Sequence, residues 1–435
     1  MRIRRRWMSL AVLGALGVVA GCDDQGDPVT TTPASVPSLP ELPKGPGSIP
    51  VVTPSSAYKK VDPKSFDVKG PLVQDRFLAK IVQTVDGLNH PLGVAVSRDG
   101  KFLYVTNTAH TGAGGMLEGG GSVGKYAIGD DGRLTAVNAA LARGLTAPMG
   151  IGVLPKATKT FPAGTLFVST GTTYACDAAG ELIVDEKRLK PGVTMIDPDT
   201  GATLGFIPMG SKTPVARSLT GGDRSRPGGQ PVYGPAGLTF GADGDLFVCD
   251  VGQPGEHVEG KSPSWLPRPG VLRVRHRELD AAAAGGAELN VAFVSVRFVP
   301  VAIHFTPLDG GNLFWACAGQ GAGGGAVWRT TPDTFGQSNT VRNVIGDLGP
   351  LTGVGITSRG TCFMSRADGD LVLINRQKID QLRFAYEDQP VFATPGAFVF
   401  HVLPTGETVC YLPEQEPGPI DAKQRLRVIL MPSSL

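Results

Sequence analysis

Six polar side chains lie where short apolar runs end or begin, and together they could bind a ligand. They are His90, Asn107, Thr170, Asp250, Gln320 and Arg366. An imidazole, two amides, a hydroxyl, a carboxylate and a guanidinium supply both donors and acceptors of hydrogen bonds. Asn107 and Asp250 also carry the oxygen atoms that calcium prefers. These residue types predict a binding site for a polar ligand, with calcium on Asn107 and Asp250 as an alternative.

Other stretches resemble chemical motifs less closely. Residues 119–125 nearly match a phosphate-binding loop, but Tyr126 stands where the motif needs a magnesium-binding Ser or Thr. A strand also follows this stretch, whereas the motif needs a helix whose N-terminus faces the phosphate. For the metal, one carboxylate and one amide form a poor cage for a hard cation. Asn107 and Asp250 could instead cap turns at strand ends, so we predict no cofactor.

These residues are positioned by a phrase that recurs along the chain: Pro-x-Gly, an alternating apolar strand, a turn with Gly and a second short strand. Residues 91–107 hold the first copy, and residues 235–250 repeat it almost position for position. Such a two-stranded unit cannot bury both faces alone, whereas a closed ring of units can, which predicts a β-propeller. Weaker copies begin at Pro148, Pro300, Thr352 and Pro395.

Each copy continues with two further strands, such as residues 271–275 and residues 290–296. Their period-two alternation and Gly/Asp turns fit four antiparallel strands per blade. We therefore predict an all-β, six-bladed β-propeller, with seven blades as the alternative. The last copy lacks a fourth strand, and residues 77–85 can supply it. An N-terminal strand in that place would close the ring and remove exposed sheet edges.

The Pro-x-Gly pattern, the Asp-Gly turns and the Tyr-Val-Thr-Asn sequence at 104–107 resemble NHL-repeat, YVTN-repeat and gluconolactonase-like six-bladed propellers. The resemblance covers most of residues 77–435. For the gluconolactonase-like enzymes it implies Glu, Asn and Asp around one divalent metal, and Asn107 and Asp250 match two of these. No Glu stands at the starts of the first strands, which read His90, Ala147, Gly234, Val299, Leu351 and Thr394.

Loop lengths indicate which face of the ring carries function. Connections from second to third strands and from one blade to the next open on the same face, which we call the long-loop face. Long loops gathered on one face commonly carry binding sites, whereas the opposite turns, such as 98–100 and 242–244, are minimal. The long connections are 108–121, 171–191, 205–234, 251–269 and 318–325.

The N-terminus predicts export and lipid anchoring. Residues 1–21 combine a basic start with a short apolar run, as in a signal peptide. Val19-Ala20-Gly21-Cys22 resembles a bacterial lipobox, which implies cleavage before Cys22 and acylation of its sulfur; an ordinary signal peptide is the alternative. Residues 22–72 are rich in Pro, Thr and Ser and should form a disordered tether to a propeller at 73–435. We expect a periplasmic-side location on a bacterial membrane.

Charge and cysteine content restrict the classes of partner that the chain can bind. The full chain has a net charge of +2, and removal of residues 1–21, which hold four arginines and no acid, would leave −2. This balance gives no electrostatic footprint for nucleic acid. Cys176, Cys249, Cys317, Cys362 and Cys410 remain besides Cys22, and four of them fall in second strands as small buried hydrophobes. We predict binding of a protein, glycan or small ligand, with a calcium-dependent lactonase-like hydrolase as the alternative.

Overall fold

The structure is a computed structural model. The predicted signal peptide at 1–21, the Cys22 anchor and the whole tether at 22–72 fall outside the residues that it describes. Those residues are 79–110, 115–172, 175–181, 183, 186–209, 234–251, 269–285, 292–295, 299–318, 325–336, 340–375, 378–381, 392–415 and 424–432.

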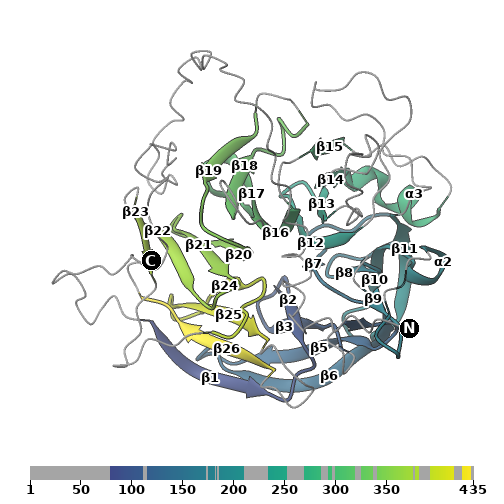
Figure 1. Ribbon diagram of the computed structural model, residues 1–435, viewed down its shortest axis with the longest axis horizontal. Coiled ribbons are helices and arrows are strands. Elements are labelled where there is room, and N and C mark those ends of the chain that lie inside the picture. The colour runs from purple at the N-terminus through teal and green to yellow at the C-terminus, as the bar shows by residue number, and fades with distance from the viewer. Residues whose placement is uncertain are drawn as a thin grey trace, which may run out of the picture.

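Six four-stranded antiparallel sheets surround a central axis (Figure 1). The first strand of each sheet lies innermost and contacts the first strands of both neighbouring sheets. This arrangement confirms the predicted all-β, six-bladed β-propeller. From the axis outwards the strands are β2 (Pro91–Val96), β3 (Phe102–Asn107), β5 (Gly121–Ile128) and β6 (Leu134–Leu145) in blade 1; β7 (Ile151–Val153), β8 (Leu166–Thr170), β10 (Gly192–Ile196) and β11 (Thr203–Pro208) in blade 2; β12 (Pro235–Phe240), β13 (Leu246–Asp250), β14 (Gly270–Val274) and β15 (Ala292–Ser295) in blade 3; β16 (Val299–Thr306), β17 (Asn312–Ala318), β18 (Ala326–Thr330) and β19 (Arg342–Ile345) in blade 4; β20 (Leu351–Ile356), β21 (Cys362–Arg366), β22 (Leu371–Asn375) and β23 (Lys378–Gln381) in blade 5; and β24 (Val399–Val402), β25 (Thr408–Glu414), β26 (Arg425–Leu430) and β1 (Lys80–Asp86) in blade 6.

The hydrophobic cores lie between neighbouring blades, because successive side chains of a strand point to opposite faces of its sheet. In β3, Leu103 and Val105 belong to a buried cluster with Tyr411 of blade 6. Tyr104, between them, belongs to a cluster with Val168 of blade 2. The alternation that predicts a strand therefore also determines which neighbouring blade each side chain contacts.

The N-terminal strand closes the ring, as predicted, and residues 77 and 78 of the predicted strand lie outside the described residues. β1 pairs with β26 from Lys80 to Asp86, so the outer edge of blade 6 is built from the start of the chain. Arg427 of β26 donates a 2.7 Å hydrogen bond to Thr84 Oγ1. The Gln83 side chain forms two hydrogen bonds with the main chain of Leu134 in blade 1. Its Nε2 donates to the carbonyl oxygen at 2.9 Å, and its Oε1 accepts from the amide at 2.7 Å. β1 is thereby joined to both blade 6 and blade 1.

The Gly of the Pro-x-Gly phrase is required by close approach between innermost strands. A Cβ at Gly93 would lie 2.4 Å from the carbonyl oxygen of Met149 in the next blade, and one at Gly150 would lie 2.4 Å from that of Ala236. Main chain faces main chain here, so a side chain could not move aside. The recurring Gly thus lets the first strands pack tightly around the axis.

We expect Gly150→Ala to lower the free energy of unfolding by about 1–3 kcal/mol, the range for overpacking a well-packed site. All three nearest atoms, from residues 236–238, belong to the main chain of blade 3. Gly346→Ala is the matched control, because its Cβ would meet only Asn343 Oδ1 at 4.0 Å. Chemical denaturation of both variants checks this, and equal stability of the two would contradict the packing argument.

Basic residues in the third strands join neighbouring blades at their outer parts. Lys125 of β5 donates to the carbonyl oxygen of Pro198 at 2.9 Å and pairs with Asp199 at 2.8 Å, both in blade 2. Arg273 of β14 donates to the carbonyl oxygen of Pro332 in blade 4 at 2.7 Å. The two cations take the same place in their blades and reach a Pro-Asp turn of the next blade. The sequence analysis did not identify these contacts.

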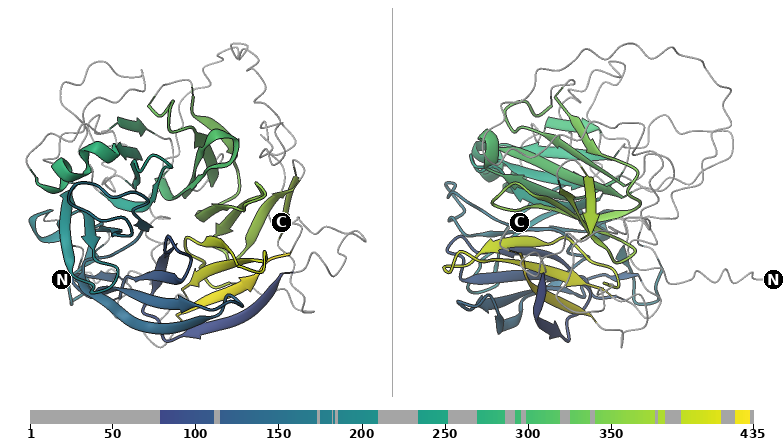
Figure 2. Two further views of the ribbon diagram at one scale, coloured as in Figure 1. Left: turned by 180° about the vertical axis from the view of Figure 1, so that it is seen from behind. Right: turned by 90° about the vertical axis from the view of Figure 1, so that its left-hand side faces the viewer.

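Helices are few and peripheral. α3 (Leu279–Ala283) follows the 3₁₀ turn η4 (His276–Glu278), and it lies at the outer rim of the ring (Figure 2). Asp280 accepts hydrogen bonds from the Thr158 hydroxyl at 2.6 Å and the Lys159 amide at 3.0 Å, which links blade 3 to blade 2. A second 3₁₀ turn, η5 (Leu308–Gly310), joins β16 to β17. Within the described ranges, no helix is long and apolar enough to cross a membrane.

Candidate functional site

The second strands end and the first strands begin on one face of the ring, so side chains from several blades are presented around the axis. Register pairs place Asn107 opposite Pro91, Asp250 opposite Pro235 and Arg366 opposite Leu351. The predicted residues that the structure describes, namely His90, Asn107, Thr170, Asp250 and Arg366, all lie at this end of their sheets, and all are buried. Gln320 lies outside the described residues, and β17 ends at Ala318.

In three blades, a hydroxyl side chain one residue before the end of the second strand joins the blade to the next one. Thr106 donates to the carbonyl oxygen of Met149 at 2.9 Å, and Ser169 donates to that of Ala236 at 2.5 Å. Ser365 repeats the contact with the carbonyl oxygen of Gly396 at 3.0 Å. The main-chain carbonyls of Met149, Ala236 and Gly396 at this end of the ring are therefore already hydrogen-bonded between blades.

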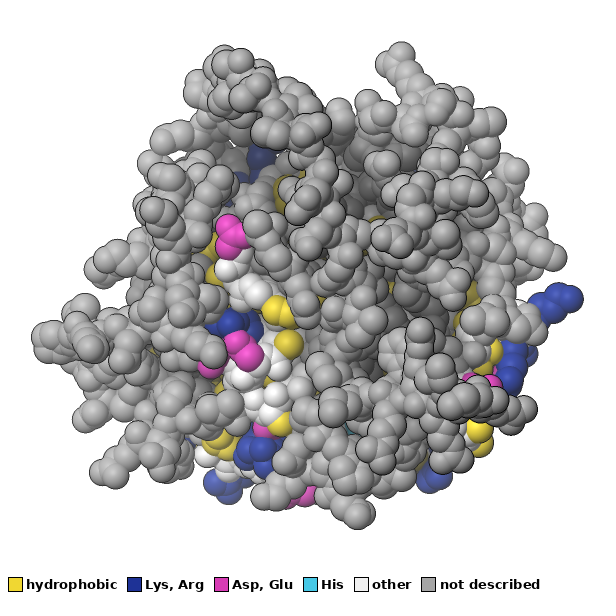
Figure 3. Space-filling model, viewed as in Figure 1, with side chains coloured by type: hydrophobic (Ala, Val, Ile, Leu, Met, Phe, Trp, Pro, Cys, Tyr) yellow, Lys and Arg dark blue, Asp and Glu magenta, His cyan; other side chains and the backbone are white. Residues whose placement is uncertain are grey.

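Arg366 is held by two carboxylates of its own blade. Its guanidinium pairs with Asp368, and its Nη1 lies 3.3 Å from Asp370 Oδ2. The arginine side chain is 7% exposed, so its charge is neutralised before a ligand arrives. Figure 3 shows the same mixture of signs, with basic side chains beside acidic ones on the described surface of that view. Arg366 is therefore a weak candidate for binding an anion by charge.

Glu414 lies on the long-loop face and was not identified from the sequence. It closes β25 just as Asn107 closes β3 and Asp250 closes β13. The carboxylate is fully buried and accepts hydrogen bonds from Arg425 at 2.7 Å and Arg427 at 2.8 Å. Burial would raise the pKa of Glu414, but the hydrogen bonds from both arginines and the Ala393 amide hold that pKa below its usual value. Its position at the end of the second strand of blade 6 was the signal available in the sequence.

Asn107 and Asp250 are the two residues of the predicted calcium site. Asp250 is 1% exposed, and its Oδ1 accepts the Gly234 amide at 3.0 Å. Together they offer one carboxylate and one amide, whereas calcium takes about six to eight oxygen ligands. Among the described residues, no three His, Cys, Asp or Glu side chains cluster as a metal site would require. This donor set does not fit a calcium cage, and we derive no chemistry through a metal.

Two histidines of blade 1 form the most distinctive feature of this face. His90 and His110 stack with ring centroids 3.7 Å apart and an angle of 11° between the ring planes. Left-handed backbone at His90 (φ 55°) and Ala109 (φ 48°) sets the direction of the chain on both sides of the stack. Such conformations are costly for residues with side chains and concentrate at functional sites. The sequence analysis selected His90 but not its partner.

Both imidazoles are neutral near pH 7. Burial lowers the pKa of His90 to about 4, and burial together with His90 lowers the pKa of His110 to about 3. A neutral imidazole has one nitrogen that donates and one that accepts. His90 Nδ1 lies 3.3 Å from Asn89 Oδ1, whereas His110 Nε2 and Asn107 Oδ1 are buried without a hydrogen-bond partner. The stack therefore offers polarity without charge.

We expect stability to fall as the pH drops from about 6.5 towards 4. The unfolded histidines take up protons below about 6.5, whereas the folded pair stays neutral, so each contributes about 1.4 kcal/mol per pH unit in that window. Replacing the pair, by His90→Asn with His110→Phe, should flatten this part of the profile. Denaturant unfolding at several pH values checks this, and an unchanged profile in the double variant would contradict the assignment.

A Gly-x-Ser-x-Gly sequence at residues 120–124 also lies on this face. Its central Ser122 belongs to β5, where it pairs with Asn107 on one side and Arg143 on the other. A hydrolase nucleophile needs a sharp strand-to-helix turn that exposes the hydroxyl. Ser122 lies within a regular sheet instead, so this sequence does not form such a turn.

The sequence matches no family model, and no curated protein matches it either. Solved structures do resemble the fold. A gluconolactonase from Xanthomonas campestris is 12% identical, with a TM-score of 0.46 over 82% of this chain and 95% of that chain. A periplasmic gluconolactonase from Pseudomonas aeruginosa is 16% identical, with a TM-score of 0.42 over 79% and 89%. A putative oxidoreductase (glucose dehydrogenase) from a Thermus species is 16% identical, with a TM-score of 0.44 over 81% and 99%. At these sequence identities and TM-scores, the activities of these proteins cannot be assigned to this chain.

Proposed function

We propose that this chain is a lipid-anchored, extracytoplasmic binding protein that takes its partner on the long-loop face. One observation carries the proposal. Among the described residues of that face, Arg366 pairs with Asp368 and Asp370, and Glu414 pairs with Arg425 and Arg427, whereas the neutral atoms Asn107 Oδ1 and His110 Nε2 are buried without hydrogen-bond partners. Such a surface suits recognition by hydrogen bonds and shape.

The alternative, a metal-dependent lactonase-like hydrolase, needs a different set of side chains. A carboxylate must be free to hold the metal or move a proton. Glu414 is bound by two arginines, and Asp250 accepts a main-chain amide. With its carboxylates used in this way, the described face supports binding better than hydrolysis.

Photocrosslinking tests which face binds the partner. A photoreactive residue replaces Lys187, which is exposed on α2 (Glu186–Leu189) at the long-loop face. The matched control replaces Asp243, which is exposed in the minimal turn between β12 and β13 on the opposite face. In cells that make the full chain, we expect crosslinked partners from position 187 only. Crosslinks from position 243 alone would contradict the proposal.

The anchor has its own prediction. Cys22→Ser should leave the chain unprocessed or release it from the membrane, because the acyl chains that hold it would have no sulfur to bind. Partitioning of wild-type and variant protein into detergent, with the processed N-terminus determined by mass spectrometry, checks this. A correctly cleaved serine variant that still partitions like wild type would show that the anchor assignment is wrong.

A further inference from the structure

The loops of blades 1 and 2 join into a cap beside the histidine stack. β4 (Met116–Leu117) of blade 1 pairs in parallel with β9 (Ala175–Cys176) of blade 2. The Glu118 amide donates to the carbonyl oxygen of Cys176 at 2.9 Å, and Arg188 holds the Glu118 carboxylate with Nε at 2.8 Å. We call residues 115–120 and 175–189, so far as they are described, the blade 1–2 cap. The sequence did not predict this extra sheet.

Three buried polar atoms lie in or next to this cap without a hydrogen-bond partner. They are Asn107 Oδ1, His110 Nε2 and Thr172 Oγ1, in residues that are 3%, 8% and 0% exposed. Leaving a buried polar atom unpaired costs about 1–3 kcal/mol, and native structures rarely keep such atoms. Three of them in one neighbourhood indicate a ligand or ordered water that completes their hydrogen bonds.

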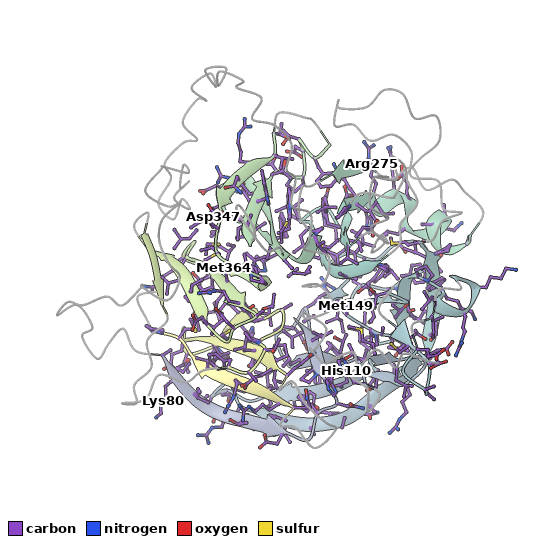
Figure 4. The ribbon with its side chains drawn as sticks, viewed as in Figure 1. Lys80, His110, Met149, Arg275, Asp347 and Met364 are labelled. Atoms are coloured by element: carbon purple, nitrogen blue, oxygen red, sulfur yellow. The ribbon has the colours of Figure 1, made fainter. Side chains whose placement is uncertain are left out.

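Main-chain contacts show that the three residues share this neighbourhood. Asn107 lies opposite Pro91, the neighbour of His90, whose ring stacks on His110. His110 forms a bridge with Met116 of β4. Met116 pairs with Ala175, whose amide donates to the Thr172 carbonyl at 3.1 Å. Figure 4 shows His110 between the ring axis and the outer strands of blade 1, on the side next to blade 2.

We propose that the blade 1–2 cap covers a binding site for a small uncharged hydroxylated ligand, such as a cyclic polyol. This inference rests on the proposed binding function and places one ligand class on that face. Asn107 Oδ1 can only accept, while His110 Nε2 and the Thr172 hydroxyl can each donate or accept. A hydroxyl group donates and accepts at once, so hydroxyls complement all three atoms.

The surroundings favour an uncharged ligand. The stacked imidazoles carry no charge near neutral pH, because burial lowers the pKa of both. Apolar side chains of the cap, Met116 and Ile183, are buried against the same core as Met149. A charged ligand would leave water here without a countercharge, which is costly. Hydroxyl groups beside the apolar side chains of the cap avoid that cost.

An ion pair at the solvent-accessible edge of the cap links its two parts. Its ion pair, Arg188 with Glu118, is solvent-accessible, with side chains 48% and 27% exposed. Exposed pairs of this kind contribute little to stability, and β4 and β9 are two residues long each. This ion pair is therefore the part of the cap that can be changed at least cost to the fold, because Met116, Ile183 and Leu189 are buried in the core. Arg188→Gln should raise the rate of ligand entry while leaving the ligand contacts in place.

Calorimetric titration of the mature full chain with glycerol, myo-inositol and D-glucose tests the site, with gluconate as the charged control. We expect one neutral polyol to bind and gluconate to bind at least tenfold more weakly. His110→Phe keeps an aromatic ring for the stack but removes Nε2, and it should weaken polyol binding at least tenfold. His401→Phe, a histidine at the opposite face beside Gly100, should bind like wild type.

Four results would overturn the site: no heat with any polyol, preference for gluconate, equal binding by the His110 and His401 variants, or a crystal soaked in polyol that shows only a water on Asn107 Oδ1 and His110 Nε2. Crosslinking of a macromolecule from position 187 in a protein that binds no polyol would keep the proposed function and reject this site. The two proposals can therefore fail separately.

Discussion

Glu414→Gln is expected to lower the free energy of unfolding by about 3–5 kcal/mol, the cost of removing one partner from a buried ion pair. The carboxylate is fully buried, and both Arg425 and Arg427 donate to its Oε2. A neutral amide would leave two largely buried guanidinium groups with less compensation. Arg427 also binds Thr84 of the closing strand, so the damage should reach the closure of the ring.

Urea denaturation checks this expectation, with Glu407→Gln as the matched control in the same blade. Glu407 is exposed in the turn before β25, where its carboxylate accepts only the nearby Thr405 hydroxyl among the described contacts. Its replacement should change stability by less than about 0.5 kcal/mol. A loss below 1 kcal/mol for Glu414→Gln would show that the two arginines do not depend on this carboxylate.

Deletion of residues 71–86 is expected to prevent stable folding, whereas deletion of residues 23–70 should leave the melting temperature nearly unchanged. The first deletion removes β1, which forms the outer strand of blade 6 and pairs with β26 along six register positions. It also removes Gln83, which binds the main chain of Leu134 in blade 1. The exposed edge of β26 would then be open to pairing with other chains.

Soluble yield, size-exclusion chromatography and thermal unfolding of the two deletions check this expectation. The protein that lacks residues 23–70 but keeps β1 should have the same oligomeric state as wild type and unfold at the wild-type temperature. The protein without β1 should aggregate or lose most of its stability. If both deletions were tolerated equally, the N-terminal strand would not be what closes the ring.

The repeat allowed most of the fold to be predicted, because each part of the repeated pattern is required by a local feature of the structure. Gly93 and Gly150 permit close approach of main chains. Alternate side chains of residues 102–107 pack into the cores on the two sides of the blade. What could not be predicted depends on contacts between distant residues. The pairing of β4 with β9 joins two-residue strands with no pattern of their own.

The candidate site was predicted only in part. Strand ends selected Asn107, Asp250 and Arg366 correctly as residues of one face. Spacing could not show that Arg366 is neutralised by its own blade or that His110 stacks on His90. Those properties arise from side-chain directions set by left-handed backbone and by turns, which residue types alone do not determine.

Lactone hydrolysis by dialysed mature protein, with the metal content of the same sample determined, tests most directly whether this face binds or catalyses. One carboxylate and one amide should hold calcium no more tightly than about 10⁻⁴ to 10⁻³ M, the range of weak extracellular sites. We therefore expect no stoichiometric metal after dialysis and no calcium-dependent turnover of simple lactones. Near-stoichiometric metal together with turnover that Asp250→Ala abolishes would contradict the binding function and establish the hydrolase.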